Sequence, residues 1–188
     1  AGLKVVIFEA DNVGGTCLNV GCIPTKTYVH SATFGEAVER SQQVVEQLRT
    51  GVEQILSHSN ITLVRGRASF VDAHTVTCPV TCPLCGDPVT APHIIIAVGS
   101  ETKTIPVEGL DDPRVVDSTG LLALDTLPRR LCIIGAGVIG MEFASVFRRF
   151  GSEVTIIEYM KECLPALDSD IARRLRKTLE KRGITFRM

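Results

Sequence analysis

The chain has 188 residues, of which 45% are hydrophobic and 22% are charged, and its formal net charge at pH 7 is −1. These values are ordinary for a globular protein and give no electrostatic case for binding nucleic acid or an anionic membrane. We expect neither a membrane span nor a secretory signal. Seven cysteines in a chain of this size favour cytoplasmic redox or metal chemistry over a secreted disulfide scaffold.

The first part of the chain is expected to combine strands with helices. An apolar run at Val5 to Phe8 predicts a buried parallel strand that ends at Glu9. A glycine pair then opens a helix that holds Cys17 and Cys22, and a second helical stripe follows over 31–57. The other elements expected here are short β segments at 61–64, 68–71 and 75–77, and a buried strand at 93–98.

From residue 130 onward, strand and helix patterns alternate. Strands are expected at 131–134 and 154–157 and again from 184, with helices to about 150 and over 168–182 between them. Such alternation is typical of βαβ units with a parallel sheet. We therefore predict an α/β protein with Rossmann-like parallel-sheet nucleotide-binding domains and a boundary near Pro128.

A glycine-rich motif follows the strand at 131–134. It consists of Gly135, Ala136, Gly137, Val138, Ile139 and Gly140. Because the motif follows a strand, opens a helix and has the acid Glu158 at the end of the next strand, it predicts a dinucleotide site. The helix N-terminus attracts the pyrophosphate, while the Glu158 carboxylate would bind ribose hydroxyls and repel a 2′-phosphate. The motif therefore predicts NAD rather than NADP.

Both ends of the chain resemble interrupted elements. The first residues run directly into a strand, the last ones begin another, and neither end has the polar composition of a natural terminus. Glu9 ends its strand as Glu158 does, and a glycine motif that matches it would precede Ala1. We therefore expect the chain to be a piece of a longer protein.

Cys17 and Cys22 lie five positions apart in the predicted helix. On an ideal helix this spacing gives a rise of about 7.5 Å and a Cα separation of about 8.7 Å, beyond the roughly 6.8 Å limit of a disulfide. A bridge therefore requires a distorted first turn, for which Gly14, Gly15 and Gly21 provide backbone freedom. Such a bridge would be strained and easily reduced, as suits catalysis. Two buried, unpaired cysteines are the alternative.

The segment GGTCLNVGCIPTK, residues 14–26, resembles the active-site signature of the flavin-dependent pyridine nucleotide–disulfide oxidoreductases. The resemblance extends through IIIAVGSE and GAGVIGMEFASVFRRFGSEVTIIE, and it covers nearly all of this chain but less than half of a full family member. Within the family, Leu18 and Ile23 are most similar to the dihydrolipoamide dehydrogenases, because glutathione and mercuric reductases usually have Val at both positions. The resemblance implies FAD and NAD as cofactors.

The resemblance also implies a role for individual residues. Cys17 is expected to exchange with the substrate, Cys22 to lie against the flavin, and Lys26 to lie beside the reactive flavin edge. Glu142 is expected to help place the nicotinamide ribose. The other FAD contacts are expected from Glu9, Gly14, Gly15, Thr16, Ala68, Gly99 and Ser100. Position 98 is Val where the family usually has Thr, so one hydroxyl contact is lost.

The implied reaction oxidises the dihydrolipoamide of a lipoyl domain from a 2-oxoacid dehydrogenase or glycine cleavage complex. Electrons pass through a Cys17–Cys22 disulfide and FAD, and reach NAD⁺ as hydride. We expect residues 1–128 to form an FAD-binding domain without its N-terminal glycine motif, and residues 129–188 to begin an NAD-binding domain. The catalytic His belongs to a C-terminal dimerisation domain of the homodimeric parent. None of the four histidines here is assigned, and the chain alone is expected to be inactive.

The segment TCPVTCPLCGDP, residues 77–88, has no counterpart in the family pattern. Cys82 and Cys85 resemble a zinc knuckle, and Cys78 could add a third ligand. A structural zinc site normally has two such pairs, so a surface hairpin without metal is favoured. Two alternatives to the lipoamide reaction therefore stay open: another disulfide reductase of the glutathione or mercuric reductase type, and a non-catalytic metal- or partner-binding module.

Overall fold

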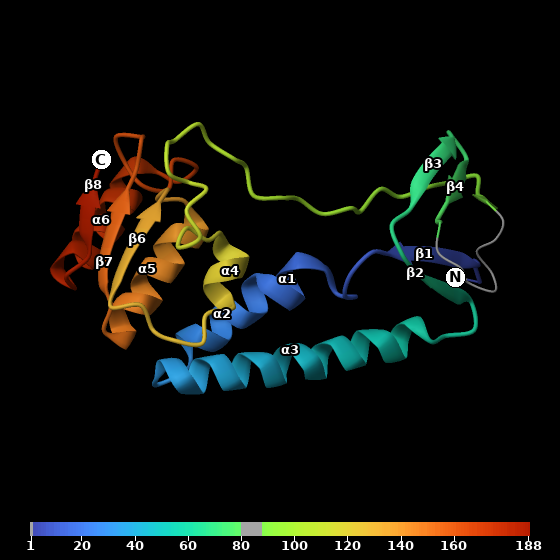
Figure 1. The fold of residues 1–188 in the computed structure, drawn as a ribbon, viewed down its shortest axis with the longest axis horizontal. Helices are drawn as coiled ribbons and strands as arrows, with labels where there is room; N and C mark the ends of the chain where they lie inside the picture. Colours follow the sequence, from blue (N-terminus) through green and yellow to red (C-terminus); the bar gives the residue numbers. More distant parts are fainter. Residues whose placement is uncertain (1, 80–87) are drawn as a thin grey trace. The chain divides into compact units, whose positions relative to one another are not determined.

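The computed structural model describes residues 2–79 and 88–188. It divides into two compact units, the first formed by residues 1–19 and 45–106 and the second by residues 20–44 and 107–188. Helices α1 (Gly15–Val20) and α3 (Phe34–Leu56) each contribute residues to both units (Figure 1). The predicted domain boundary near Pro128 stays a prediction.

The first unit contains two small sheets. Strand β1 (Val5–Glu9) pairs in parallel with β2 (Ile61–Arg65), and Glu9 lies opposite Arg65. Strands β3 (Ser69–Asp72), β4 (Thr75–Thr77) and β5 (Val89–Thr90) form an antiparallel sheet in that order. The core of this unit is small: Val64 and Cys78 are buried, and Phe8 packs against them.

Two expectations for the first unit are wrong. Residues 93–98 form no strand, and Ile95 and Val98 are 90% and 89% exposed. A strand exists only where a neighbouring backbone exchanges hydrogen bonds with it, and no described strand of this unit pairs with that segment. Strand β1 is likewise less buried than its apolar run predicts, because β2 is its one described neighbour, and Val5 and Val6 are 43% and 38% exposed.

The second unit has the alternating architecture that the sequence predicts. Strands β6 (Arg130–Ile134), β7 (Glu153–Ile157) and β8 (Thr185–Arg187) form a parallel sheet in that order. Helix α5 (Val138–Phe150) connects β6 to β7, and α6 (Ser169–Lys181) connects β7 to β8 (Figure 1). The unit also contains α2 (Cys22–Val29) and α4 (Ser118–Leu122). This βαβαβ order is a Rossmann-like half.

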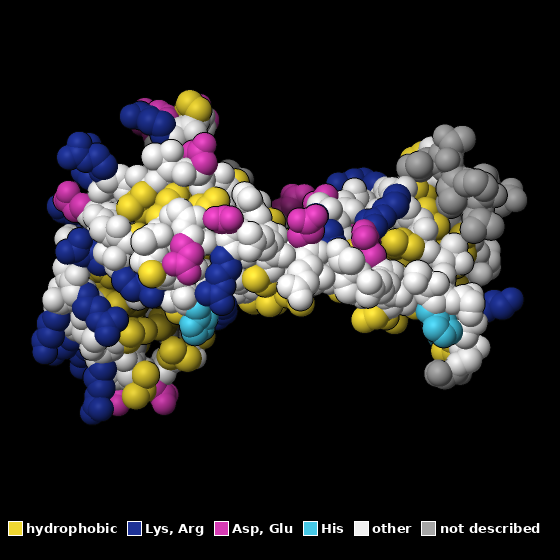
Figure 2. Space-filling view, turned by 90° about the horizontal axis from the view of Figure 1, so that it is seen from below, with side chains coloured by type: hydrophobic (Ala, Val, Ile, Leu, Met, Phe, Trp, Pro, Cys, Tyr) yellow, Lys and Arg dark blue, Asp and Glu magenta, His cyan; other side chains and the backbone are white. Residues whose placement is uncertain are grey.

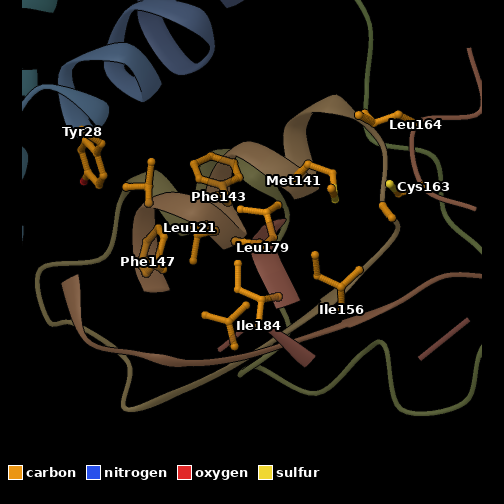
Figure 3. Packing of buried hydrophobic residues seen from close by; sticks show 14 of the residues in the cluster. Tyr28, Leu121, Met141, Phe143, Phe147, Ile156, Cys163, Leu164, Leu179 and Ile184 are labelled. Atoms are coloured by element: carbon orange, nitrogen blue, oxygen red, sulfur yellow. The ribbon is translucent and has the colours of Figure 1, made fainter. Parts of the chain in front are cut away.

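The core of the second unit lies between helices and one face of this sheet. Figure 3 shows side chains of α2, α4, α5 and α6 packed with Ile156 of β7. The aromatic rings of Tyr28, Phe34, Phe143, Phe147 and Phe150 form one cluster with centroid separations of 5.9 to 6.5 Å. Residues of β6 alternate in burial, and Cys132 is exposed. Leu131 and Ile133 pack against the core, so Cys132 lies on the opposite, exposed face of the strand.

Charged side chains cover the outside of this core. Figure 2 shows Lys and Arg side chains gathered over the second unit, with acidic side chains between them. On α6, Arg173, Arg174 and Lys177 are exposed while Leu179 is buried, so the charged side chains of this helix lie on its solvated face. Among the described residues, no helix is long and apolar enough to cross a membrane.

Candidate dinucleotide and dithiol site

Residues 135–140, here called the glycine turn, connect the end of β6 to the start of α5. Gly135 has φ +105°, a left-handed conformation that favours glycine. A Cβ at Gly140 would lie 2.2 Å from the carbonyl oxygen of Gly135, so only glycine allows this approach of helix and turn. At Gly137 a Cβ would meet nothing within 4 Å, and the backbone here borders open space. The glycines therefore fit the close approach of a pyrophosphate.

The acid at the end of β7 lies against the same turn. The N–H of Ala136 donates to Glu158 Oε2 at 2.6 Å, and the N–H of Met160 donates to Glu158 Oε1 at 2.8 Å. The first turn of α5 carries no acidic residue, and Gly137 caps it without a side-chain hydrogen bond. The structure thus brings all members of the predicted NAD motif together, and the donor set fits a dinucleotide.

The two cysteines of the signature lie on different helices. Cys17 is in α1, Cys22 begins α2, and Gly21 separates the helices with φ −134° and ψ −113°. The predicted single helix is therefore wrong, and the chain breaks at Gly21, one of the glycines expected to provide backbone freedom. Both cysteines are exposed. Their bridge stays a prediction, since Cys17 belongs to the first unit and Cys22 to the second.

Pro24 lies within α2 and does not interrupt it. It lies in the first turn of α2, where a missing N–H costs no intrahelical hydrogen bond. The N–H and the hydroxyl of Thr25 both donate to the Gly21 carbonyl, at 3.1 and 2.6 Å. The break between the helices is thereby held by the residues that follow it.

Lys26 forms an ion pair with Glu142. Lys26 lies on α2 and Glu142 on α5, both in the second unit, so the lysine expected beside the flavin and the acid expected near the nicotinamide ribose meet. Arg149 of α5 reinforces this junction, because its guanidinium donates to the carbonyls of Tyr28 and Val29 at 2.7 Å. Helix α2, which begins with Cys22, is therefore fixed to the helix that follows the glycine turn.

Most of the residues that are predicted to bind FAD lie at the end of β1 or in the segments next to it. Glu9 Oε1 accepts from the N–H of Asp11 at 3.0 Å, and the Glu9 carbonyl accepts from the N–H of Gly66 at 2.8 Å, shortly before Ala68. Gly14 and Gly15 have φ of +103° and +67°, and both precede the exposed Thr16. These residues fit the adenosine and pyrophosphate of FAD. Residues 99 and 100 are exposed and belong to no element, and their role as FAD contacts stays a prediction.

Asn19 is a residue that sequence reasoning missed. Its side-chain N–H₂ group donates to the carbonyls of Val13 and Gly15, both at 3.0 Å, and its Oδ1 accepts from Arg49 at 2.8 Å. The signal that would have found it is an amide side chain in the helix that follows the glycine pair, where it can reach backbone carbonyls of the loop that contains the pair. Asn19 therefore holds the loop that contains the glycine pair.

The cysteine-rich segment is only partly within the described residues. Cys82 and Cys85 lie outside them, so the structure does not test a zinc site there. Cys78 is buried against Val64 and Phe8. Among the described residues, no group of three His, Cys, Asp or Glu side chains could hold a metal ion.

The sequence pattern of one protein family, described as pyridine nucleotide-disulphide oxidoreductase, matches residues 1–188. The chain belongs to this family. The family consists of FAD-dependent, NAD(P)-linked oxidoreductases, and the geometry of the glycine turn agrees with that chemistry. The family assignment and the Rossmann-like fold predicted from the sequence are both confirmed.

Individual family members show how much of a whole protein is present. Dihydrolipoyl dehydrogenase of Pisum sativum is 35% identical over 100% of this chain and 42% of its own length, and leghemoglobin reductase of Glycine max is 35% identical over 100% and 40%. The solved structure of the HOCl-induced flavoprotein disulfide reductase RclA from Escherichia coli is 40% identical, with a TM-score of 0.89 over 98% of this chain and 43% of that protein. The chain thus spans about two fifths of these relatives.

Proposed function

We propose that the protein of which this chain is part is a dihydrolipoamide dehydrogenase. The observation that carries the proposal is the junction of α2 and α5: Cys22 begins a helix whose Lys26 is paired with Glu142, one turn beyond the glycine turn. A redox-active thiol and a nucleotide-binding turn are thereby supported by the same pair of helices. Relatives named dihydrolipoyl dehydrogenase support the substrate.

In the proposed reaction, a thiolate of dihydrolipoamide attacks the Cys17 sulfur and opens the Cys17–Cys22 disulfide. The second substrate thiol then displaces Cys17, so the substrate leaves as the cyclic disulfide and both cysteines are reduced. Two electrons and two protons leave the substrate in this exchange. FAD, when bound, accepts the two electrons and passes them to NAD⁺ as hydride. Lys26 lies four residues after Cys22 on α2, where it is paired with Glu142.

The test uses the full-length protein with three cysteine variants. Cys17→Ser and Cys22→Ser are expected to abolish lipoamide-dependent exchange with NAD⁺, because each removes one sulfur of the bridge. Cys132→Ser is the matched control, since Cys132 is an exposed cysteine of β6, and it is expected to keep the wild-type rate. Wild-type turnover in either of the first two variants, or a protein that purifies without flavin absorbance, would overturn the proposal.

A second candidate function rests on one observation. RclA is 39–40% identical to this chain in three solved structures, compared with 35% for the dihydrolipoyl dehydrogenases. Two of these RclA structures are Cu(II) complexes, so the alternative is a disulfide reductase that acts on an oxidant other than lipoamide. Assays of the same protein with lipoamide, glutathione disulfide, Hg(II) and Cu(II) separate the two. Turnover with one of the last three and none with lipoamide would favour the alternative.

The partner and the compartment belong to the same proposal. A lipoyl domain is the partner that a dihydrolipoamide dehydrogenase requires, and the homodimer is proposed for the full-length protein. We propose a cytoplasmic location from the cysteine content, although relatives from Pisum sativum and Arabidopsis thaliana have names that include "mitochondrial". Fractionation of cells that express the full-length protein would decide between the two compartments.

A further inference from the structure

Residues 158–168 connect β7 to α6 and are here called the strap. The strap holds Ala136 of the glycine turn through both of its backbone polar groups. The N–H of Ala136 donates to Glu158 Oε2 at 2.6 Å, and the carbonyl of Ala136 accepts from the N–H of Leu164 at 2.9 Å. The position of the turn therefore depends on the start of the strap, at Glu158, and on its middle, at Leu164.

The middle of the strap is anchored in the core. Cys163 is 0% exposed and Leu164 is 6% exposed, and Figure 3 shows both beside Met141 and Ile156. The Cys163 thiol donates to the carbonyl of Ala172 in α6 at 3.4 Å. Leu164 has φ +50°, a left-handed conformation that is costly for a branched residue. Such a conformation persists only where surrounding contacts enforce it.

One of these contacts is an ion pair that joins the strap to α6. Arg176 donates through Nε to Glu162 Oε1 at 2.7 Å and through Nη2 to Oε2 at 3.0 Å, a two-point fork. Glu162 Oε1 also accepts from the N–H of Cys163 at 3.1 Å. Arg176 is fixed in turn by Glu180, whose Oε1 accepts from Nη1 at 2.8 Å. Side chains of Glu162 and Arg176 are 19% and 20% exposed.

We propose that the Glu162–Arg176 pair is a positioning element for the dinucleotide, acting through Cys163 and Leu164 on the carbonyl of Ala136 in the glycine turn. The inference rests on the proposed binding of NAD to that turn. Neither side chain has a described contact with the turn itself. Their effect is to fix the backbone N–H of Leu164, which determines how the turn presents its N–H groups to a pyrophosphate.

Because the ion pair is a two-point fork, two substitutions should weaken it to different degrees. Glu162→Gln keeps the shape but removes the charge, whereas Arg176→Lys keeps the charge but loses the fork. The dissociation constants of NAD⁺ and of ADP-ribose, measured by titration calorimetry on the full-length protein, are expected to rise about 3- to 30-fold in Glu162→Gln. ADP-ribose lacks the nicotinamide, so an equal effect on both ligands places the change at the turn. Arg176→Lys is expected to weaken the binding of both ligands less than Glu162→Gln does.

Two controls separate positioning from general stability. Ile184→Val removes one methyl group from the core of the same unit, and it is expected to lower the melting temperature without changing NAD⁺ affinity. Asp112→Asn removes an exposed ion pair with Arg114 in the same unit, and it is expected to change neither property. Amide hydrogen exchange at Ala136 and Leu164 is expected to rise in Glu162→Gln and in Arg176→Lys, but in neither control.

The outcomes of these measurements test the positioning role of the ion pair separately from the proposed NAD site. Glu162→Gln and Arg176→Lys proteins that melt earlier, yet bind both ligands as the wild type does and show unchanged exchange at Ala136, would make the pair merely structural and overturn the inference. Should Glu162→Gln fail to fold, Arg176→Lys alone decides by the same two measurements. A folded wild-type protein that binds neither ligand would contradict the proposed NAD site, and the inference would fall with it.

Discussion

Glu9 in the first unit and Glu158 in the second each end or follow a parallel strand, but their surroundings differ. Glu158 accepts a hydrogen bond from Ala136, which lies 22 positions earlier in the glycine turn. The described hydrogen bond of the Glu9 carboxylate comes from Asp11, two positions later. The carboxylate at the end of the strand therefore accepts a hydrogen bond from a distant part of the chain in the second unit. In the first unit, its described hydrogen bond comes from the loop that follows it.

The cores of the two units differ in the same way. In the second unit, residues from helices α2 to α6 and from β7 form one large buried cluster. In the first, the described cluster consists of two buried residues and one neighbour. Helices that cover a parallel sheet bury its apolar face, and this covering is more complete in the second unit. Stability should therefore depend more strongly on the second unit.

Phe147→Ala tests this difference at its strongest point. Phe147 is 0% exposed, and its ring lies 5.9 to 6.5 Å from the rings of Phe34, Phe143, Tyr28 and Phe150. Removing a fully buried ring leaves a cavity, and the free energy of unfolding should fall by about 3–5 kcal/mol. Urea denaturation of wild type and variant measures the change. A loss below about 1 kcal/mol would show that this cluster is not the core of the unit.

Gly140→Ala and Gly137→Ala separate packing from ligand approach in the glycine turn. At Gly140 a Cβ would lie 2.2 Å from a backbone oxygen, so overpacking should cost about 1–3 kcal/mol of stability. At Gly137 the space is open, but Gly137 is the N-cap of α5 and Ala is a poorer N-cap than Gly, so stability should fall by about 0.5–1 kcal/mol, while the methyl group obstructs the pyrophosphate. NAD⁺ titration together with urea denaturation checks both. Unchanged NAD⁺ affinity in Gly137→Ala would argue against the turn as the binding site.

The ion pair of the strap predicts a dependence of stability on pH. The fork from Arg176 lowers the pKa of Glu162 from 4.5 to about 2. Because the folded-state pKa is lower than the unfolded one, the stabilisation is complete above about pH 4.5 and is lost as the pH falls toward 2. Glu162→Gln should cost about 1.5 kcal/mol at neutral pH, and this difference from wild type should shrink below pH 4.5. A difference that stays constant in acid would contradict the pairing.

Local patterns in the sequence predicted most of the second unit. The apolar run at Leu131, the glycine motif and the acid at Glu158 each carry their meaning within a few residues, and the structure confirms the strand, turn and helix they predict. The helix break at Gly21 was predicted only on condition that Cys17 and Cys22 form a disulfide, since the distance between their Cα atoms on an ideal helix is too long for one. The pair of Lys26 and Glu142 was not, because 116 positions separate them.

Burial was the property that local patterns predicted least well. The exposure of Cys132 and of residues 93–98 depends on whether another strand or helix covers them, which no window of a few residues records. The role of the strap depends on the same kind of information. Leu164 reaches Ala136 across 28 positions, and nothing in its neighbours marks a backbone contact of this kind.

Ile95→Ser gives the smallest expected effect and tests the first unit directly. Ile95 is 90% exposed in a segment without strand pairing, so a polar side chain there should change the free energy of unfolding by less than about 0.5 kcal/mol. In a buried strand, the same change would remove a large apolar contact and cost several times more. Urea denaturation of this chain distinguishes the two. A loss of about 2 kcal/mol or more would mean that residues 93–98 pack against a neighbour, and the contrast between the two units would then be smaller than their described cores indicate.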